Sequence, residues 1–318
     1  VASSLARRGL VVSFLPAMPL HLLPPHPLDP SAISDLALLA ARGRHQPIPA
    51  ESADAWLCRA FGLAKAASAP LSLLGEGGAP GDAVWLFATP VHFAVERQGL
   101  RVLDGRHFDL AHDEADALLA SLDAHFAADG WHFTRRADPR RWYLRTTLTA
   151  PATLPLDTVS GRLAPPSPFV GEAARVWHRL ASEAQMLLHA HPLNAAREAR
   201  GALPINGLWL WGGGPLPARA ESPFDAVYAH GPLARGLARH AGLAAQAVPQ
   251  DPSRLAGRAP LVVLDDPAQL SAWRAALQEG RFAAQYLYLP QRGVRIEIRR
   301  GDRWKFWRRR TLPPFTET

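Results

Sequence analysis

The residues best suited to chemistry lie between Glu183 and Gly214. Ten residues of this segment are candidates, namely a carboxylate, two histidines, two asparagines, two arginines and three successive glycines: Glu183, His189, His191, Asn194, Arg197, Arg200, Asn206, Gly212, Gly213 and Gly214. Arg197 and Arg200 share one face of a helix, because residues three apart are neighbours on its surface. Two guanidinium groups on one face suit an anionic group, and glycine-loop amides can assist them. We therefore predict that these ten residues bind a small anionic ligand.

Several members of this group also have a structural interpretation. Glu183 falls at the edge of an apolar helix face, where pairing with Arg197 or Arg200 and a catalytic role both stay open. Two histidines without a third ligand are more typical of a helix end than of a metal site. The glycines lack the Gly-Lys-Ser/Thr sequence of a phosphate loop and favour a tight turn. We assign no catalytic residue, no metal ligand and no cofactor.

The elements that must position these residues can be read from the same stretch. Residues 171–190 form an amphipathic helix, and Pro192 ends it. Asn194 is a natural N-cap for a short helix that carries both arginines and ends at Gly201. A strand from Ile205 to Trp211 then runs into the glycines. This places a flexible loop at the carboxyl end of a sheet strand, where α/β sheets bind ligands.

The proline-rich stretch 151–168 divides the chain. Residues 1–150 mix helical and strand patterns, including helices at 31–43 and 52–66, and predict an α+β region. Residues 169–318 alternate strands with helices at 232–241 and 267–279. That order predicts an α/β fold with a largely parallel sheet and flanking helices.

Charge is concentrated at the C-terminal end. The chain has a formal net charge of +7, and residues 291–318 hold nine basic and three acidic side chains. Their apolar neighbours Val294, Ile296 and Ile298 alternate with them, and Trp304, Phe306 and Trp307 follow. We predict a basic β-hairpin over Arg292 to Arg310 with one buried face, in preference to a nucleic-acid site.

Composition excludes several classes of protein. With 48% apolar and 20% charged residues among 318, the chain is not of the disordered type. The single cysteine, Cys58, excludes internal disulfides and paired-thiolate zinc sites. Pro16, Pro19 and His21 interrupt the apolar run after Arg7 and Arg8, and no stretch is long enough to span a membrane. We expect a bacterial cytoplasmic protein.

Two families resemble this sequence. The segment His191 to Gly214, HPLNAAREARGALPINGLWLWGGG, resembles archaeal-type cofactor-independent phosphoglycerate mutases of the alkaline-phosphatase superfamily. Over roughly residues 80–310 the chain is similar to the bacterial regulatory protein RpfE family. Its matching pieces are Asp138-Pro139, Arg141 to Leu144, Glu183 to Gln185, Leu188-His189, the same segment His191 to Gly214, and Phe306 to Arg309.

The sequence differs from the mutases in the residues that would coordinate metal ions. Resemblance to those enzymes implies two divalent metals and a serine nucleophile, which need converging carboxylates and imidazoles. Asp265-Asp266 and Asp104-Gly105 each follow a strand, but without accompanying histidines. We therefore expect a non-catalytic regulatory or ligand-binding relative that binds an anionic phosphoester, with a protein partner also open. One alternative is a metal-dependent phosphoryl-transfer enzyme, an isomerase or phosphatase, using His189, His191 and Asp265. Another is a nucleic-acid or protein interaction module formed by the hairpin.

Overall fold

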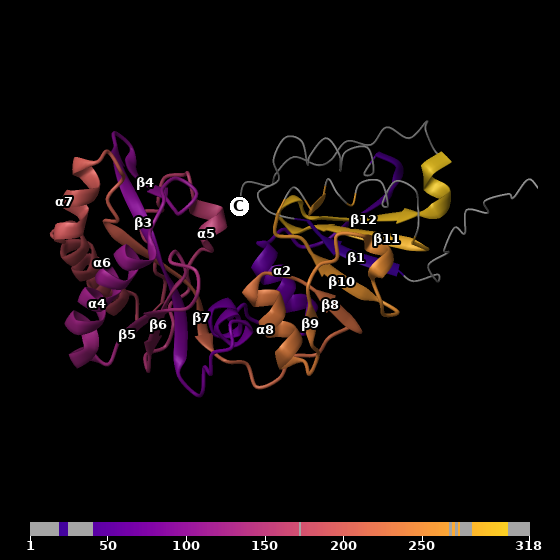
Figure 1. Cartoon of the computed structure of the whole chain (residues 1–318), viewed down its shortest axis with the longest axis horizontal. Coiled ribbons are helices and arrows are strands. Elements are labelled where there is room, and N and C mark those ends of the chain that lie inside the picture. The colour runs from indigo at the N-terminus through magenta and orange to yellow at the C-terminus, as the bar shows by residue number, and fades with distance from the viewer. Residues whose placement is uncertain are drawn as a thin grey trace, which may run out of the picture.

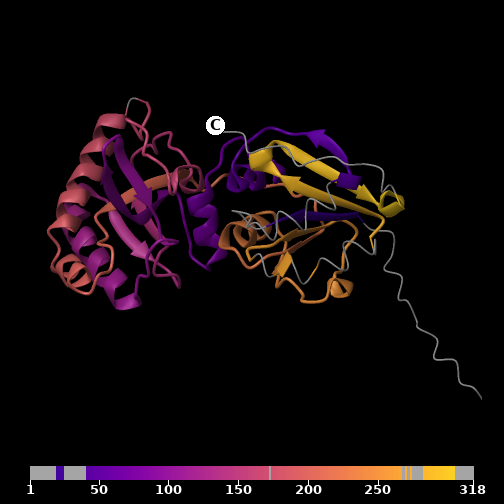
Figure 2. The ribbon, with the colours of Figure 1, turned by 90° about the horizontal axis from the view of Figure 1, so that it is seen from above.

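Two lobes lie side by side in the protein (Figures 1 and 2). The computed structural model describes residues 19–24, 41–171, 173–266, 269–270, 273 and 282–304. One lobe, the α/β lobe, is built on a seven-stranded sheet in the order β2-β12-β11-β1-β10-β8-β9. The other, the antiparallel lobe, is built on the sheet β4-β3-β6-β5, with β7 also paired to β3.

The sheet of the α/β lobe is largely parallel. Strand β1 lies parallel to both β10 and β11, and β8 and β9 continue the parallel order, whereas β12 and β2 are antiparallel additions. The strands span Pro19–Leu23 (β1), Arg44–Pro47 (β2), Ala226–Tyr228 (β8), Ala245–Gln246 (β9), Pro260–Val263 (β10), Ala284–Leu289 (β11) and Val294–Arg299 (β12). Leu20 and Leu22 pack in one core and Leu23 in another, because successive side chains point to opposite faces of the sheet. Both faces of this sheet are therefore buried.

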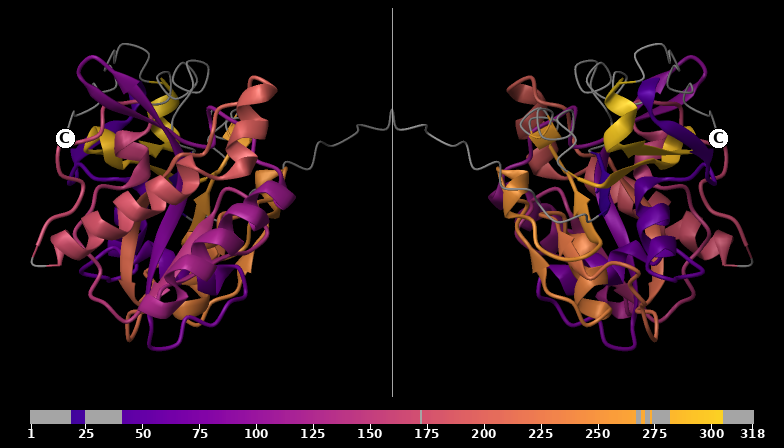
Figure 3. Two further views of the ribbon diagram at one scale, coloured as in Figure 1. Left: turned by 90° about the vertical axis from the view of Figure 1, so that its left-hand side faces the viewer. Right: turned by 90° about the vertical axis from the view of Figure 1, so that its right-hand side faces the viewer.

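The long strand β3 organises the antiparallel lobe. It spans Val84–Glu96 and pairs with β4 (Gly99–Leu103), β6 (Trp142–Thr146) and β7 (Gly207–Pro215), while β5 (His132–Arg135) pairs with β6. Leu86 and Ala88 of β3 face a core with α4 (His112–Phe126) and α6 (Ala174–His189). These two helices, followed by α7 (Pro192–Ala199), cover the outer face of the sheet (Figure 3, left).

The opposite face of β3 meets helix α3 (Ser68–Gly75). Trp85 and Phe87 pack with Ala69 and Leu73 of α3. On its other side α3 packs on α8 (Pro232–His240) of the α/β lobe, and Leu71 shares a core there with Leu233 and Leu237. Helix α2 (Ala53–Ala60) contributes Trp56 and Leu57 to the same core. Helix α3 therefore joins the two lobes.

The backbones of α3 and α8 touch, and glycine makes this contact possible. A Cβ atom on Gly75 would lie 1.9 Å from the carbonyl oxygen of Pro232, and one on Gly236 would lie 1.7 Å from that of Leu71. No side chain fits at either distance, so both positions require glycine for the helices to approach this closely.

The α/β fold class predicted from the sequence is confirmed, with a largely parallel sheet in one lobe. The lobes do not follow the two predicted halves. Strands β1 and β2, from before the proline-rich stretch, lie in the sheet with β8 to β12, and β7 from after it pairs with β3. Within residues 151–168 a short helix, α5 (Leu156–Val159), forms. The chain thus crosses between lobes more than once, which a division along the sequence cannot reveal.

The C-terminal hairpin is formed differently from the prediction. Val294, Ile296 and Ile298 are buried as expected, but β12 pairs with β11 before it, through a 3-10 turn at Pro290–Arg292. Residues Arg300–Trp304 form a 3-10 helix instead of a returning strand. Arg292 is buried, and Arg295 lies over the ring of Tyr286. The predicted Phe306 to Arg310 portion lies outside the described residues, as do most of the predicted helices at 31–43 and 267–279.

Within the described part of the chain, no helix combines the length and apolar character needed to cross a membrane.

We expect Gly75→Ala and Gly236→Ala to destabilise the protein by about 3 kcal/mol or more, because the added methyl group meets backbone atoms that cannot rotate away. Chemical denaturation followed by circular dichroism measures this change. Gly301→Ala is the matched control, since nothing lies within 4 Å of its added Cβ. Equal stability of all three variants would show that the helices do not depend on this close contact.

Candidate functional site

Asn194 is a buried structural residue in the segment that the sequence singled out. Its side-chain amide donates to the carbonyl oxygens of Leu188 at 2.7 Å and Ile205 at 2.8 Å, and its Oδ1 accepts from the Ile205 amide at 2.8 Å. His191, not Asn194, caps α7: its Nδ1 accepts from the Leu193 amide at 3.2 Å. Asn194 thus ties the end of α6 to the segment that enters β7.

Arg197 and Arg200 pair with Glu114 of α4. Arg197 is 1% exposed; its Nη1 lies 2.6 Å from Glu114 Oε2, and its other nitrogens donate to the carbonyl oxygens of Asp109 and Leu203. Arg200 binds the second carboxylate oxygen of Glu114. Burial favours a higher pKa for Glu114, but hydrogen bonds from Arg200 and the Ala111 amide, with the charge of Arg197, hold its pKa below the usual value.

The remaining members of the predicted group are scattered around this cluster. Glu183 pairs with Arg179 at 3.3 Å and His125 at 3.7 Å on the surface, so neither Arg197 nor Arg200 is its partner. Asn206 binds the backbone amide and carbonyl of Phe93 on β3. His189 is exposed, and His191 Nε2 lies 3.1 Å from Ser121 Oγ.

Gly212, Gly213 and Gly214 do not form the predicted loop or turn. They continue β7, which pairs with β3 through a register shift between Trp85 and Phe87. A Cβ on Gly212, whose φ is +63°, would lie 2.4 Å from Ser68 Oγ, and one on Gly213 would lie 2.7 Å from Leu86 Cγ. Glycine is needed here because α3 and β3 press against the strand. Ligand binding by the ten-residue group stays a prediction, and the buried members have partners within the chain.

A cavity of about 500 Å³ lies elsewhere, between the two lobes. In the α/β lobe its walls are the carboxyl ends of β1 and β10, helix α2 and the beginning of α8; in the antiparallel lobe they are the turns after β4 and before β6, with Trp211 of β7. Eight charged residues line it: Asp54, Asp104, Asp138, Asp157, Asp265, Arg106, Arg140 and Arg141. This size suits a small-molecule ligand.

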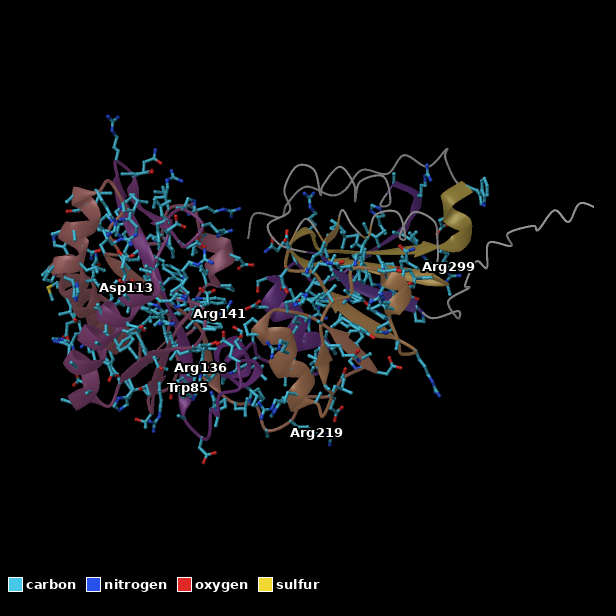
Figure 4. All side chains as sticks on the ribbon, in the orientation of Figure 1. Trp85, Asp113, Arg136, Arg141, Arg219 and Arg299 are labelled. Atoms are coloured by element: carbon cyan, nitrogen blue, oxygen red, sulfur yellow. The ribbon has the colours of Figure 1, made fainter. Side chains whose placement is uncertain are left out.

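The three arginines come from two turns of the antiparallel lobe. Arg106 Nε lies 3.0 Å from Asp104 Oδ2, and its terminal nitrogens meet no partner among the described residues. Arg140 Nη1 donates to the Gly105 carbonyl at 3.1 Å. Arg141 Nη1 donates to Glu76 Oε1 at 2.8 Å, and Figure 4 shows Arg141 where this lobe faces the other. Each guanidinium is therefore held along one edge while it lines the cavity.

Behind Arg141, Glu76 forms a second hydrogen bond. Tyr143 is fully buried and donates its hydroxyl to Glu76 Oε2 at 2.6 Å. Burial, followed by the bond to Glu76, raises the pKa of Tyr143, so this hydroxyl keeps its proton as a donor. Glu76 directly follows the last residue of α3 and so ties Arg141 to the helix that joins the lobes.

Three carboxyl groups line the cavity without an arginine at hydrogen-bond distance. Asp265 Oδ2 accepts from the Gly231 amide at 2.9 Å, and burial raises its pKa. Asp157 Oδ2 accepts from Gln291 at 2.8 Å, whereas its buried Oδ1 has no hydrogen-bond partner among the described residues. Burial also raises the pKa of Asp157.

Asp54 lies in the first turn of α2, and its pKa is raised from 3.8 to about 7. Burial is the main cause, and the charge of Asp157 adds to it, while the charge of Arg141 and a hydrogen bond with Ser68 act in the opposite direction. Asp54 therefore changes its charge near neutral pH.

The sequence identified only part of this cavity. Asp265 and Asp104-Gly105 stood out as strand-end carboxylates, and the structure brings them to the same cavity. Asp138 and Arg141 belonged to the family resemblance, whereas Asp54, Arg106, Arg140 and Asp157 were missed. The turn sequences Asp-Gly-Arg at 104–106 and Asp-Pro-Arg-Arg at 138–141 were the available signal.

The three residues of the metal-dependent alternative, His189, His191 and Asp265, do not come together in the structure. His189 and His191 lie at the junction of α6 and α7 on the outer edge of the antiparallel lobe, whereas Asp265 follows β10 in the other lobe (Figure 1). Among the described residues, no three His, Cys, Asp or Glu side chains gather in a way that could hold a metal ion.

Comparison with known proteins gives distant structural similarity. No family model matches the chain, and no curated protein matches it. The PH0037 protein from Pyrococcus horikoshii is 13% identical, with 89% of this chain and 87% of that chain covered and a TM-score of 0.49. A cofactor-independent phosphoglycerate mutase from Thermoplasma acidophilum DSM 1728 is 16% identical, with 89% of each chain covered and a TM-score of 0.38. The resemblance to the RpfE family stays a prediction.

We expect Arg197→Met to destabilise the protein by about 3–5 kcal/mol, because Glu114 would stay buried with less compensating charge. Arg179→Met is the control: Arg179 is exposed and pairs with Glu183 at the surface, so its loss should cost within about 1 kcal/mol. Urea denaturation measures both. A similar small loss in both variants would contradict the structural role of the Glu114 cluster.

We expect the stability difference between Asp54→Asn and the wild type to depend on pH. Folded Asp54 keeps its proton up to about pH 7, but the unfolded group ionises near 3.8, so wild-type stability falls as the pH rises between these values. The variant lacks this loss and should gain on the order of 2–4 kcal/mol relative to wild type from pH 4 to pH 8. Denaturation across this range measures the difference; a constant difference would contradict the assignment.

Proposed function

We propose that this chain is a non-catalytic regulatory protein that binds a small anionic metabolite, such as a phosphoester, in the cavity between its lobes. The observation that carries this proposal is the set of three guanidinium groups, Arg106, Arg140 and Arg141, on one wall of a cavity of about 500 Å³. Guanidinium groups form directional, charge-assisted hydrogen bonds with phosphate and carboxylate oxygens.

The arginines are oriented before any ligand arrives. Asp104 holds Arg106, and the Gly105 carbonyl holds Arg140, so one short turn positions two of the three groups. Glu76 holds Arg141 from the end of α3. Because the side chains are already ordered by these bonds, less conformational entropy is lost when an anion binds.

The sequence also points to the arginine wall as a binding surface. Asp138-Pro139 and the run from Arg141 to Leu144 are pieces that carry the resemblance to the RpfE family, and Asp138 and Arg141 line the cavity. The non-catalytic part of the proposal rests on the sequence, where the strand-end carboxylates lack the accompanying histidines of the mutase pattern.

Isothermal titration calorimetry with 3-phosphoglycerate, phosphoglycolate, phosphoenolpyruvate and O-phosphoserine tests the proposal. We expect wild-type protein to bind at least one of these, and Arg106→Ala to weaken that binding about tenfold or more, since charge-assisted hydrogen bonds contribute about 1.5–3 kcal/mol each. Arg97→Ala, an exposed arginine outside the cavity, should bind like wild type.

No binding by wild type at millimolar concentrations of all four compounds would overturn the proposal. Turnover of a bound phosphoester, detected as release of inorganic phosphate or as isomerised product, would overturn its non-catalytic part.

A further inference from the structure

We propose that the ligand of the cavity between the lobes is bipolar, with an anionic group at the arginine wall and a protonated amine at the carboxyl wall formed by Asp54 and Asp265. This inference rests on the proposed function and specifies the chemical class of the ligand. It follows from the charges of the two walls. The arginines already have carboxylate partners, whereas Asp54 and Asp265 have no ion-pair partner among the described residues.

Carboxyl groups outnumber guanidinium groups around the cavity. Five aspartates and three arginines line it, so with every group ionised the lining carries a net charge of −2. Glu76, behind Arg141, adds another negative charge. A purely anionic ligand would increase this excess in a partly desolvated space, where like charges repel strongly. An ammonium group on the same ligand offsets one of these charges, so such a ligand adds less to the excess and can place its positive charge beside the carboxyl groups.

The excess of negative charge is confined to one part of the cavity lining. Asp104 and Asp138 pair with Arg106, Arg140 and Arg141, so the arginine wall largely neutralises itself. Asp54, Asp157 and Asp265 form no ion pair among the described residues. Burial is the largest cause of the raised pKa at all three, and it outweighs the opposing charge of Arg141 at Asp54 and Asp265 and of Arg106 at Asp157.

The hydrogen-bond donors that meet the carboxyl wall are neutral groups. Asp265 accepts from the Gly231 amide at 2.9 Å, and a backbone hydrogen bond from His230 also acts on it; neither donor carries a charge. Asp54 has a hydrogen bond with the neutral Ser68 side chain. An ammonium group brings a positive charge together with three donors and no acceptor, and so supplies what these neutral donors do not.

A single metal ion fits this wall less well than an organic cation. The described carboxylates do not gather in a set of three around one point, as a protein-held ion requires. A ligand that carries both charges needs only one or two carboxylates near its amine, and its anionic group anchors it at the opposite wall. The cavity has room for such a molecule.

The test compares O-phosphoserine with 3-phosphoglycerate, which share a phosphate, a carboxylate and a three-carbon skeleton but differ in an amine against a hydroxyl group. At pH 8, calorimetry on the full chain should give a dissociation constant for O-phosphoserine at least tenfold lower than for 3-phosphoglycerate. In the double variant Asp54→Asn and Asp265→Asn this preference should fall to about twofold or less, with 3-phosphoglycerate bound at least as well as by wild type.

Asp113→Asn is the matched control, because Asp113 lies exposed on α4 in the antiparallel lobe (Figure 4), and it should keep the wild-type preference. Thermal unfolding of each variant verifies that it is folded. Equal binding of both compounds by wild type, or a preference that persists in the double variant, would overturn the bipolar ligand while the proposed function stands. Binding of neither compound would overturn the bipolar ligand, and the other two anions then decide the proposed function.

Discussion

The contact between α3 and α8 is the constraint on which the rest of the structure depends. Backbone meets backbone there, because Gly75 and Gly236 present no side chain. Helix α3 simultaneously packs on β3 through Ala69 and Leu73, so the same eight-residue helix belongs to both lobes. Close-packed helices cannot slide past one another continuously, because their surfaces interlock. A displacement of one lobe would therefore open the contact between α3 and α8 along its whole length. The distance between the lobes therefore depends on glycine at positions 75 and 236, where any other residue would add a Cβ atom to the contact.

This contact also positions both walls of the cavity. Gly75 ends α3 against the carbonyl of Pro232, the first residue of α8. One residue after Gly75, Glu76 holds Arg141; one residue before Pro232, the Gly231 amide holds Asp265. The arginine wall and the carboxyl wall are thus each bonded to an end of one of the two touching helices. Their separation is fixed by the backbone more than by the flexible side chains that line the space.

The sequence predicted individual strands and helices better than it predicted which strands pair or which side chains meet. The alternation of Val294, Ile296 and Ile298 predicted a strand with a buried face, and the glycines and prolines located many boundaries. The pairing of β1 with β10 and β11 joins residues about 240 to 265 positions apart, and no local pattern encodes that order. The same limit applied to Arg197 and Arg200: their polar types and spacing indicated a special role, but their partner, Glu114, lies 83 residues before Arg197. Two arginines on one helix face look alike in sequence whether they bind a ligand or a buried carboxylate.

The two arginine clusters of the antiparallel lobe show how burial decides between these roles. Each of the three nitrogens of Arg197 donates to the protein, to Glu114, Asp109 and Leu203, and its side chain is enclosed, so a ligand cannot reach it. Arg106 uses only its inner nitrogen on Asp104, and its outer nitrogens remain at the cavity. In both cases a carboxylate orients a guanidinium; the difference lies in how many donors remain and whether they reach open space. A buried arginine that donates to the protein from all three nitrogens stabilises the fold, whereas an arginine that donates from one nitrogen on a cavity wall is prepared to meet an anion.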